Sequence, residues 1–419
     1  MPIERLEPDL KLAAALFDSL GRATRRGRGI VRDSYGPGEQ AAHDIMHAAA
    51  DKIGLDISID AIGNLLMTLA GRDRLAPRIM IGSHLDSVPQ GGNYDGAAGV
   101  VAGLCAVSAL KQAGERPPCD ITVMGIRAEE SAWFDIAYLG SGGAFGLLDP
   151  ACLRIPRSDN GKSLEATLIE RGFDPQPIRE RRPLLDPKGI RAYLELHIEQ
   201  GPTLVAEGLP AAAVTGIRGC KRFRNARCIG RYGHSGAVNR AHRHDAVAAT
   251  VALLHHLEET WVARERAGED LVITSGEFYT DPAMHGPSKI AGETRFVIDV
   301  RSVSDATMNA VAAEARQAAA RIGKAYRVDF DLGATSDSPP AVMDERLRAA
   351  LNGRLDRPYE MASGAGHDAA VFAKMGIPTG MIFVRNDNGS HNPDEAMTLD
   401  DFSVATQALL GLLLDFPPP

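Results

Sequence analysis

The chain has 419 residues, of which 44% are hydrophobic and 24% are charged, and this length is enough for two domains with their own cores. A net charge of −8 excludes a general nucleic-acid binder, because no surplus of Lys and Arg is present to neutralise phosphates. The N-terminus shows no apolar signal segment and no apolar run is long enough for a bilayer, so we expect a cytoplasmic protein without a membrane partner. Five cysteines without metal-type spacing predict reduced thiols.

The first part of the chain alternates between helical and extended patterns. Residues 39–53 and 97–111 have the spacing of helices. Short apolar segments predict strands at residues 55–59, 64–70, 78–81 and 121–127. Strands that alternate with helices favour a largely parallel sheet, with ligands at the carboxyl ends of its strands. The basic cluster between Arg22 and Arg32 is expected to be a solvated helix end.

The second half of the chain contains a different arrangement. A polar, proline-rich segment at 151–189, with one short helix, precedes strands at 191–198 and 211–217. Elements in the ferredoxin-like order β-α-β-β-α-β follow at residues 223–230, 240–259, 271–279, 293–300, 305–322 and 326–332. The α/β pattern then resumes with helices at 345–351, 367–374 and 400–414 and a strand at 380–383. The sequence therefore predicts an α/β domain over 1–213 and 331–419, interrupted by an α+β domain over 214–330.

Acidic residues and histidines gather at the predicted strand ends of the larger domain. The four places are His84 with Asp86 and Asp95, Glu129 with Glu130, His197 with Glu199, and residues 390–392. Imidazole nitrogens and carboxylate oxygens ligate divalent ions, and a further carboxylate can hold the free N–H of a ligating histidine. Each place alone could be a structural strand-end pair. Their convergence on one sheet edge favours a metal site.

Glu129 and Glu130 directly follow a predicted strand. Adjacent carboxylates are costly unless a cation neutralises them. Neighbouring residues of an extended segment point in opposite directions, so one glutamate can ligate a metal ion while the other faces the attacking water. That other glutamate suits a general base, which takes a proton from water and passes it to the leaving nitrogen. A solvated acidic pair is the alternative.

Three motifs resemble those of the amidase/hydantoinase/carbamoylase family, the branch of dinuclear zinc exopeptidases with N-carbamoyl-L-amino-acid hydrolase, β-ureidopropionase and allantoate amidohydrolase. They are GSHLDSVPQGGNYDG at residues 82–96, ELHIEQGP at 195–202 and SHNP at 390–393. The resemblance covers about residues 30–412, with the motifs in order. It implies a zinc-exopeptidase-like catalytic domain with a mostly parallel central sheet, and an inserted ferredoxin-like lid and dimerisation domain.

The resemblance also implies a role for each matching residue. Two divalent ions would be held by His84, Asp95, Glu130, His197 and His391, with Asp95 bridging them. Asp86 would orient His84, and Glu129 would be the general base. The identity of the ions stays open, because Zn, Mn, Co and Ni all suit mixed histidine and carboxylate sites.

In relatives the lid builds a homodimer, and a lid histidine completes the partner's active site. His234, in a Gly-His-Ser-Gly segment, is the matching residue, so it would polarise the scissile carbonyl in trans. Arg301 would clamp the substrate carboxylate with its planar guanidinium. Gln200 and the backbone from Gly364 to His367 would line the pocket.

Two departures from the family pattern concern the substrate pocket. Ser288 stands where relatives commonly have an asparagine that helps Arg301 hold the substrate. After the glutamate pair the family often has Gly-Ser-Arg-Phe, whereas this chain has Ser-Ala-Trp-Phe at residues 131–134. Trp133 is therefore a candidate contact that would favour a flatter or more apolar substrate. Core packing by Trp133 is an equal alternative.

The leading hypothesis is a metal-dependent amidohydrolase that cuts a linear amide or ureido C–N bond of a small carboxylate-bearing molecule, above all an N-carbamoyl-L-amino acid. The second is an aminoacylase, a dipeptidase or another C–N hydrolase with an atypical substrate, an aromatic one included. The third is a catalytically inactive binding protein. The intact Glu129 and the full ligand set disfavour this third hypothesis.

Overall fold

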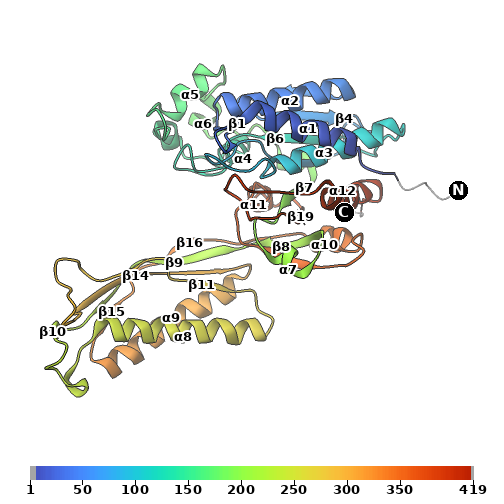
Figure 1. Cartoon of the computed structure of the whole chain (residues 1–419). Helices are drawn as coiled ribbons and strands as arrows, with labels where there is room; N and C mark the ends of the chain where they lie inside the picture. The colour runs from blue at the N-terminus through green and yellow to red at the C-terminus, as the bar shows by residue number, and fades with distance from the viewer. Residues whose placement is uncertain (1–5, 417–419) are drawn as a thin grey trace. The chain divides into compact units, whose positions relative to one another are not determined.

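The computed structural model describes residues 6–416 and divides the chain into two compact units (Figure 1). Unit 1 comprises the chain up to residue 215 and again from residue 342, and unit 2 comprises residues 216–341. Unit 2 extends beyond residue 330 because β16 (Ser336–Ser338) still pairs with β9 (Gly219–Ile229) of its sheet.

Unit 1 contains most of the helices and one large sheet. Its helices are α1 (Leu10–Thr24), α2 (Pro37–Ile53), α3 (Ala97–Gln112), α4 (Leu139–Ala144), α5 (Leu164–Glu170), α6 (Gln176–Glu180), α7 (Thr203–Glu207), α10 (Glu345–Asn352), α11 (Ala369–Lys374) and α12 (Leu399–Leu414). Short 3-10 turns lie at Pro150–Arg154 and Pro187–Gly189. The segment 151–189 has two α-helices, α5 and α6, where one was expected. They are only seven and five residues long, so each leaves little periodic pattern in the sequence.

The large sheet has nine strands in the order β17-β8-β19-β7-β5-β6-β4-β3, with β18 beside β8. These strands are β3 (Asp56–Ile59), β4 (Leu65–Leu69), β5 (Arg78–His84), β6 (Ile121–Ile126), β7 (Ile190–Ile198), β8 (Ala211–Ile217), β17 (Ala341–Val342), β18 (Glu360–Ser363) and β19 (Thr379–Val384). A separate hairpin joins β1 (Arg25–Arg26) to β2 (Gly29–Ile30). The four central strands β19, β7, β5 and β6 are parallel. The predicted mostly parallel α/β sheet is confirmed.

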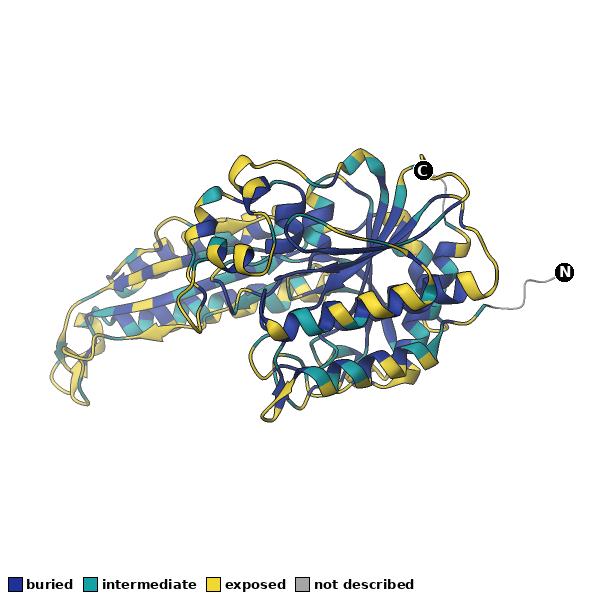
Figure 2. Ribbon diagram, turned by 90° about the horizontal axis from the view of Figure 1, so that it is seen from above, coloured by how far each residue is buried: buried dark blue, intermediate teal, exposed yellow. Residues whose placement is uncertain are grey.

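The central strands are continuous apolar runs because both faces of the sheet are covered. Every residue of β6 and β19 is buried, and so is all of β5 except its first residue, as the dark blue strands of Figure 2 show. Helix α3 packs on β5, β6 and β7 and also contacts α1 and α12. Its residues from Ala97 to Leu110 are buried on all sides, which is typical of a core helix. This rigid centre carries the strand ends that form the site.

Unit 2 is built on a six-stranded antiparallel sheet with β11-β14-β9-β15 at its centre. Its further elements are β10 (Gly233–His234), α8 (Ala246–Arg266), β11 (Val272–Thr274), β12 (Phe278–Tyr279), β13 (Lys289–Ile290), β14 (Glu293–Ser302), α9 (Asp305–Tyr326) and β15 (Asp329–Asp331), with a 3-10 turn at Arg240–His242. The predicted strand 271–279 is two short strands, β11 and β12, which both pair with β14. The main elements follow the order β-α-β-β-α-β. Helices α8 and α9 share the unit's core with the sheet.

Two expectations from composition can be compared with the fold. Within residues 6–416, no helix combines the length and the apolar character needed to cross a membrane. All five cysteines are free, as predicted, and four of them are buried.

Candidate metal centre and active site

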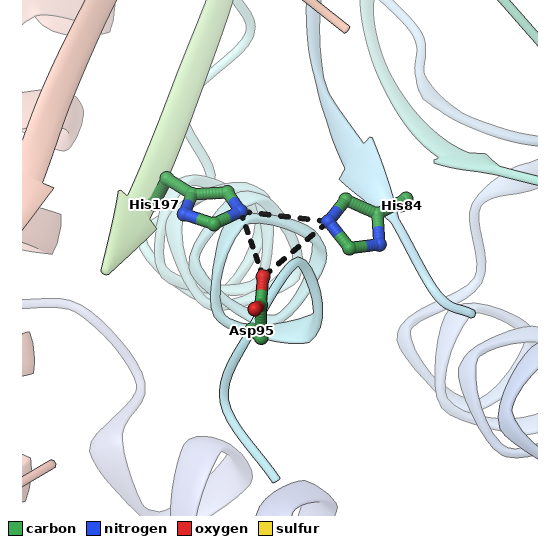
Figure 3. A group of neighbouring side chains, drawn as sticks. All are labelled: His84, Asp95 and His197. Atoms are coloured by element: carbon green, nitrogen blue, oxygen red, sulfur yellow. Dashed lines mark hydrogen bonds and ion pairs between the residues drawn. The ribbon is translucent and has the colours of Figure 1, made fainter. Parts of the chain in front are cut away.

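His84, Asp95 and His197 meet at the carboxyl ends of two parallel strands (Figure 3). His84 is the last residue of β5, His197 is next to the last residue of β7, and Asp95 lies two residues before α3. The carboxylate oxygen Oδ1 of Asp95 is 3.5 Å from Nε2 of His84 and 3.3 Å from Nε2 of His197. The two Nε2 atoms are 3.5 Å apart. All three side chains are buried.

The hydrogen bonds of the two imidazoles show that this group fits a cation. Nδ1 of His84 lies 3.1 Å from the backbone oxygen of Asp86, and Nδ1 of His197 lies 2.9 Å from that of Ile198. Carbonyl oxygens only accept, so each neutral ring carries its proton on Nδ1 and turns the lone pair of Nε2 toward Asp95. Two nitrogen lone pairs and a carboxylate oxygen then converge. With both rings neutral these donor atoms repel one another, and a divalent ion satisfies them.

A second group of ligand atoms shares Asp95 with the first. Nε2 of His391 lies 3.4 Å from Oδ2 of Asp95 and 3.3 Å from Oε1 of Glu130. Glu130 is buried, whereas the side chain of His391 is half exposed. The two oxygens of Asp95 thus face different groups, and its bridging of two ions stays a prediction.

Asp86 links the first ligand group to the glutamate pair. Its Oδ1 lies 3.4 Å from Nδ1 of His84 and accepts the backbone N–H of Glu129 at 3.0 Å. Its Oδ2 accepts the backbone N–H of Glu130 at 3.2 Å and the hydroxyl of Ser34 at 2.7 Å. The carboxylate therefore fixes both the ring of His84 and the backbone that carries the two glutamates.

Glu129 is buried but belongs to neither group that shares Asp95. Burial raises its pKa well above the ordinary value for glutamate. A protonated His84 ring would lower this pKa, whereas the negative charges of Asp368, Glu130 and Asp86 raise it further. When it is deprotonated, a carboxylate with a raised pKa is a stronger base than an ordinary glutamate, and the role of Glu129 as general base stays a prediction.

Arg32 is the exception in the basic cluster, whose other arginines are exposed as expected: Arg22, Arg25, Arg26 and Arg28. Its side chain is fully buried and donates hydrogen bonds to the backbone oxygens of Leu85 at 2.8 Å, Asp95 at 2.9 Å and Asn93 at 3.4 Å. It therefore ties both ends of the loop between β5 and α3. Sequence reasoning missed this role because the guanidinium contacts only backbone atoms more than fifty residues away.

Glu395 was also missed, although it lies four residues after His391 in the last motif. Its Oε1 accepts the backbone N–H groups of Tyr94 at 2.9 Å and Asp95 at 3.2 Å, and its Oε2 accepts the hydroxyl of Ser390 at 2.7 Å. Glu395 thus joins the last motif to the first. The only sign of this role in the sequence was an acidic residue close to the Ser-His-Asn-Pro motif.

Two of the predicted pocket residues of unit 1, Gln200 and His367, contact this centre. Gln200 donates from Nε2 to Oδ2 of Asp95 at 3.0 Å. The ring of His367 is buried, with its centroid 4.4 Å from that of His197. Gly364 directly follows β18 and precedes His367 in the same turn. What these residues bind stays a prediction.

Trp133 lies in a buried apolar cluster of unit 1 that also contains Phe134. Its indole N–H donates to the backbone oxygen of Ser87 at 2.8 Å. The guanidinium of Arg157 lies 5.2 Å from the centre of the ring. The side chain is 8% exposed, so this position fits the core-packing alternative.

In unit 2 the predicted residues His234 and Ser288 lie close together. His234 lies on β10, and the backbone N–H of the next residue, Ser235, donates to the backbone oxygen of Ser288 at 2.8 Å. Arg301 lies on β14 and donates from Nε and Nη2 to Oδ2 of Asp299, at 3.1 and 3.0 Å. Their roles toward a substrate stay predictions.

The parallel sheet with paired candidate ligand groups at its strand ends is an arrangement typical of metal-dependent hydrolases. The chain matches peptidase family M20/M25/M40 over residues 80–415 and belongs to that family. It is 32% identical over 392 residues to the N-carbamoyl-L-amino acid amidohydrolase of Geobacillus stearothermophilus, covering 91% of this chain and 92% of the relative. It is 31% identical over 365 residues to the allantoate amidohydrolase of Escherichia coli (strain K12), covering 86% of each chain.

A solved structure agrees with this assignment. The crystal structure of a hydantoinase/carbamoylase family amidase from Burkholderia ambifaria superposes with a TM-score of 0.87 at 29% identity, covering 98% of this chain and 97% of that one. The family predicted from the three motifs is confirmed. The protein is an amidohydrolase that acts on non-peptide C–N bonds.

Proposed function

We propose that the protein hydrolyses the ureido C–N bond of an N-carbamoyl-L-amino acid. The observation that carries this proposal is the pair of ligand groups that share Asp95, with Glu129 buried beside them. The similarity to an N-carbamoyl-L-amino acid amidohydrolase supports the substrate class. The products would be ammonia, carbon dioxide and the free amino acid.

Two divalent ions would complete the site, drawn from Zn, Mn, Co or Ni. His84, His197 and Asp95 would hold one, and Asp95, Glu130 and His391 the other. Bound divalent ions activate water for attack and polarise the carbonyl of the substrate.

Glu129 would move the proton in this reaction. Its carboxylate takes a proton from the attacking water and delivers it to the leaving nitrogen. The hydrogen bonds from the backbone of Glu129 and Glu130 to Asp86 keep the pair in place during both transfers. Gln200, which also binds Asp95, and the turn at Gly364 would contact the substrate.

Unit 2 would act as the lid and as the homodimer interface. Nδ1 of His234 accepts the backbone N–H groups of Gly236 at 3.1 Å and Ala237 at 3.2 Å. Its proton is therefore on Nε2, where it can be donated to the substrate carbonyl of the partner's site. Arg301, oriented by Asp299, would clamp the substrate carboxylate.

A second candidate substrate competes with the N-carbamoyl-L-amino acid in this proposal. The similarity to an allantoate amidohydrolase favours allantoate as the second candidate. Ser288 would contribute to the choice, because it stands beside the His234 segment where the family commonly has an asparagine. The cytoplasmic location stays a prediction.

A substrate panel tests the proposal. The protein is stripped with a chelator, reloaded separately with each of the four metals, and given N-carbamoyl, N-acetyl and dipeptide derivatives of one amino acid, together with allantoate. Release of ammonia and of amino acid is measured for each compound. We expect the N-carbamoyl compound to have the highest kcat/KM. Absence of turnover of every carbamoyl compound in all metal forms would overturn the proposal, and preference for allantoate would favour the second candidate.

A further inference from the structure

Tyr138 has an unusual backbone conformation between the glutamate pair and α4. Its φ is 60°, in the left-handed region that few residues other than glycine adopt. Its N–H donates to the backbone oxygen of Glu129 at 2.9 Å, and the N–H of Leu139 donates to that of Ala128 at 3.0 Å. The chain therefore folds back along the end of β6. This turn holds the tyrosine against the backbone of the proposed base.

The hydroxyl of Tyr138 lies against the turn that contains Gly366. A Cβ atom built on Gly366 would fall 1.9 Å from the hydroxyl oxygen, so the hydroxyl occupies the space that a side chain there would need. This turn, from Gly364 to His367, is the one predicted to line the substrate pocket. The backbone of Tyr138 is thus bound to that of the proposed base, and its hydroxyl lies against the backbone of the predicted pocket.

The surroundings of this hydroxyl are strongly acidic. The carboxylates whose charges act on it are those of Glu129, Asp368, Glu195 and Glu130. Burial is the largest cause of the raised pKa of Tyr138, and these charges add to it, so the phenol remains protonated. A negative environment favours a ligand that brings N–H groups over one that brings a further acceptor.

The hydroxyl of Tyr138 is also available for a ligand. Among residues 6–416 it has no side-chain hydrogen-bond partner, and it is not one of the buried polar atoms without a partner, so solvent reaches it. The phenol oxygen of a half-buried tyrosine without a hydrogen-bond partner can accept a hydrogen bond from an incoming N–H group.

We propose that the hydroxyl oxygen of Tyr138 accepts a hydrogen bond from the terminal amino group of a carbamoyl substrate, and so selects carbamoyl over acyl derivatives of the same amino acid. This inference rests on the proposed function. A carbamoyl and an acetyl group have nearly the same size and differ by NH₂ in place of CH₃. A site that pairs an N–H group discriminates against the analogue that lacks it, because the acceptor is then left without a partner.

The test compares kcat/KM for the N-carbamoyl and N-acetyl forms of one amino acid. In Tyr138→Phe we expect roughly a tenfold loss for the carbamoyl form and little change for the acetyl form, from the loss of about one hydrogen bond. Where the acetyl compound is not turned over, its inhibition constant gives the same comparison. A merely structural role for the ring would change both compounds alike. Metal content and Tm should match the wild type, since no protein hydrogen bond is removed.

The matched control is Tyr359→Phe, which removes the hydroxyl of another half-buried tyrosine of unit 1, located between α10 and β18. It should leave the carbamoyl-to-acetyl ratio unchanged. Gly366→Ala gives an independent test, because its methyl group must displace the hydroxyl of Tyr138. Gly366→Ala alone should lower the ratio of kcat/KM for the carbamoyl form to that for the acetyl form. Combined with Tyr138→Phe, it should lower this ratio little further.

The outcomes separate the two proposals. An active wild-type enzyme whose ratio does not change in Tyr138→Phe overturns the selection by Tyr138 and leaves the proposed function standing. A wild-type enzyme that hydrolyses no carbamoyl compound overturns the proposed function and this inference together.

Discussion

Asp86 makes more contacts than the single one expected of it from the sequence. One buried carboxylate accepts two backbone N–H groups and a hydroxyl, and it also faces the ring of His84. Every one of these partners can donate to a carboxylate. An amide at this position would turn its NH₂ group toward at least one donor, so the charge and the shape are both required.

Asp86→Asn should therefore weaken metal binding without removing a ligand. Residues that orient a metal-ligating histidine typically contribute about 10- to 100-fold to metal affinity or activity. Competition with a chromophoric chelator would measure the affinity, with circular dichroism as the check on folding. Unchanged affinity would show that His84 is oriented by the backbone oxygen of Asp86 alone.

Glu129→Gln separates proton transfer from metal binding. Glu129 lies outside the two groups that share Asp95, so the variant should keep its metal content. Its kcat should fall by about 10²- to 10⁴-fold, because the amide cannot take up the proton. Metal analysis and steady-state kinetics on the same sample check both parts. Retention of full turnover would assign the base to another residue.

Asp368 predicts a dependence of stability on pH. Burial, and next the charge of Glu195, raise its pKa from 3.8 to about 8. Between these two pH values the unfolded chain releases the proton while the folded chain retains it, so this group contributes stability at low pH that is lost as the pH rises to about 8.

In the metal-free protein, Asp368→Asn should therefore raise Tm relative to the wild type more at pH 8 than at pH 5. Thermal melts at both values measure the difference. Asp51→Asn, at an exposed position of α2, is the control and should show none. An equal shift at both pH values would mean that Asp368 does not change its charge over this range.

At the scale of elements, the loop between β5 and α3 is the least regular part of the site and the most tightly held. Arg32 binds its backbone oxygens, and Glu395 binds the backbone N–H groups of Tyr94 and Asp95. Asp95 is thus held through its backbone on both sides. The position of the Asp95 carboxylate depends on these contacts and not on regular secondary structure.

Gly92→Ala tests this loop. A Cβ at Gly92 would fall 2.1 Å from the carboxyl group of Glu395, so the loop or the glutamate must move. We expect a loss of about 1–3 kcal/mol in stability and weaker metal binding. Gly189→Ala is the matched control, because a Cβ there meets no atom within 4 Å. Chemical denaturation and metal titration of both variants would measure the difference. Equal stability and equal metal binding of the two variants would show that the side chain of Glu395 can move without displacing Asp95.

At the scale of the whole molecule, the metal ions should stabilise one unit more than the other. The ligand groups that share Asp95 lie in unit 1, whereas unit 2 has its own apolar core. A ligand stabilises only the state that binds it.

Metal removal by a chelator should therefore lower Tm and increase hydrogen exchange at the ends of β5 and β7. Exchange in the core strands of unit 2, β9 and β14, should change little. Mass spectrometry of exchanged peptides would measure both regions. Equal loss of protection in the two units would show that they unfold together.

Much of this structure follows from local sequence. The apolar runs of β5, β6 and β19 predict buried strands, and the acidic residues and histidines that follow such strands could be located from the sequence, whereas their roles as ligands came from the family resemblance. Arg32 and Glu395 could not be predicted in the same way, because their partners are distant in the chain: Glu395 binds the backbone of a residue 300 positions away. The exposed-or-buried state of Trp133 also depends on long-range packing.

The wide separation of the ligands has a consequence for biosynthesis. His84 and His197 are translated long before His391, and the tether from Glu395 arrives later still. A growing polypeptide on the ribosome can offer the first trio of donors, but the second trio exists only after residue 391 has emerged. If the proposed pair of cations binds, loading with both would be a late event, and a truncated fragment that lacks this histidine would not become fully metallated.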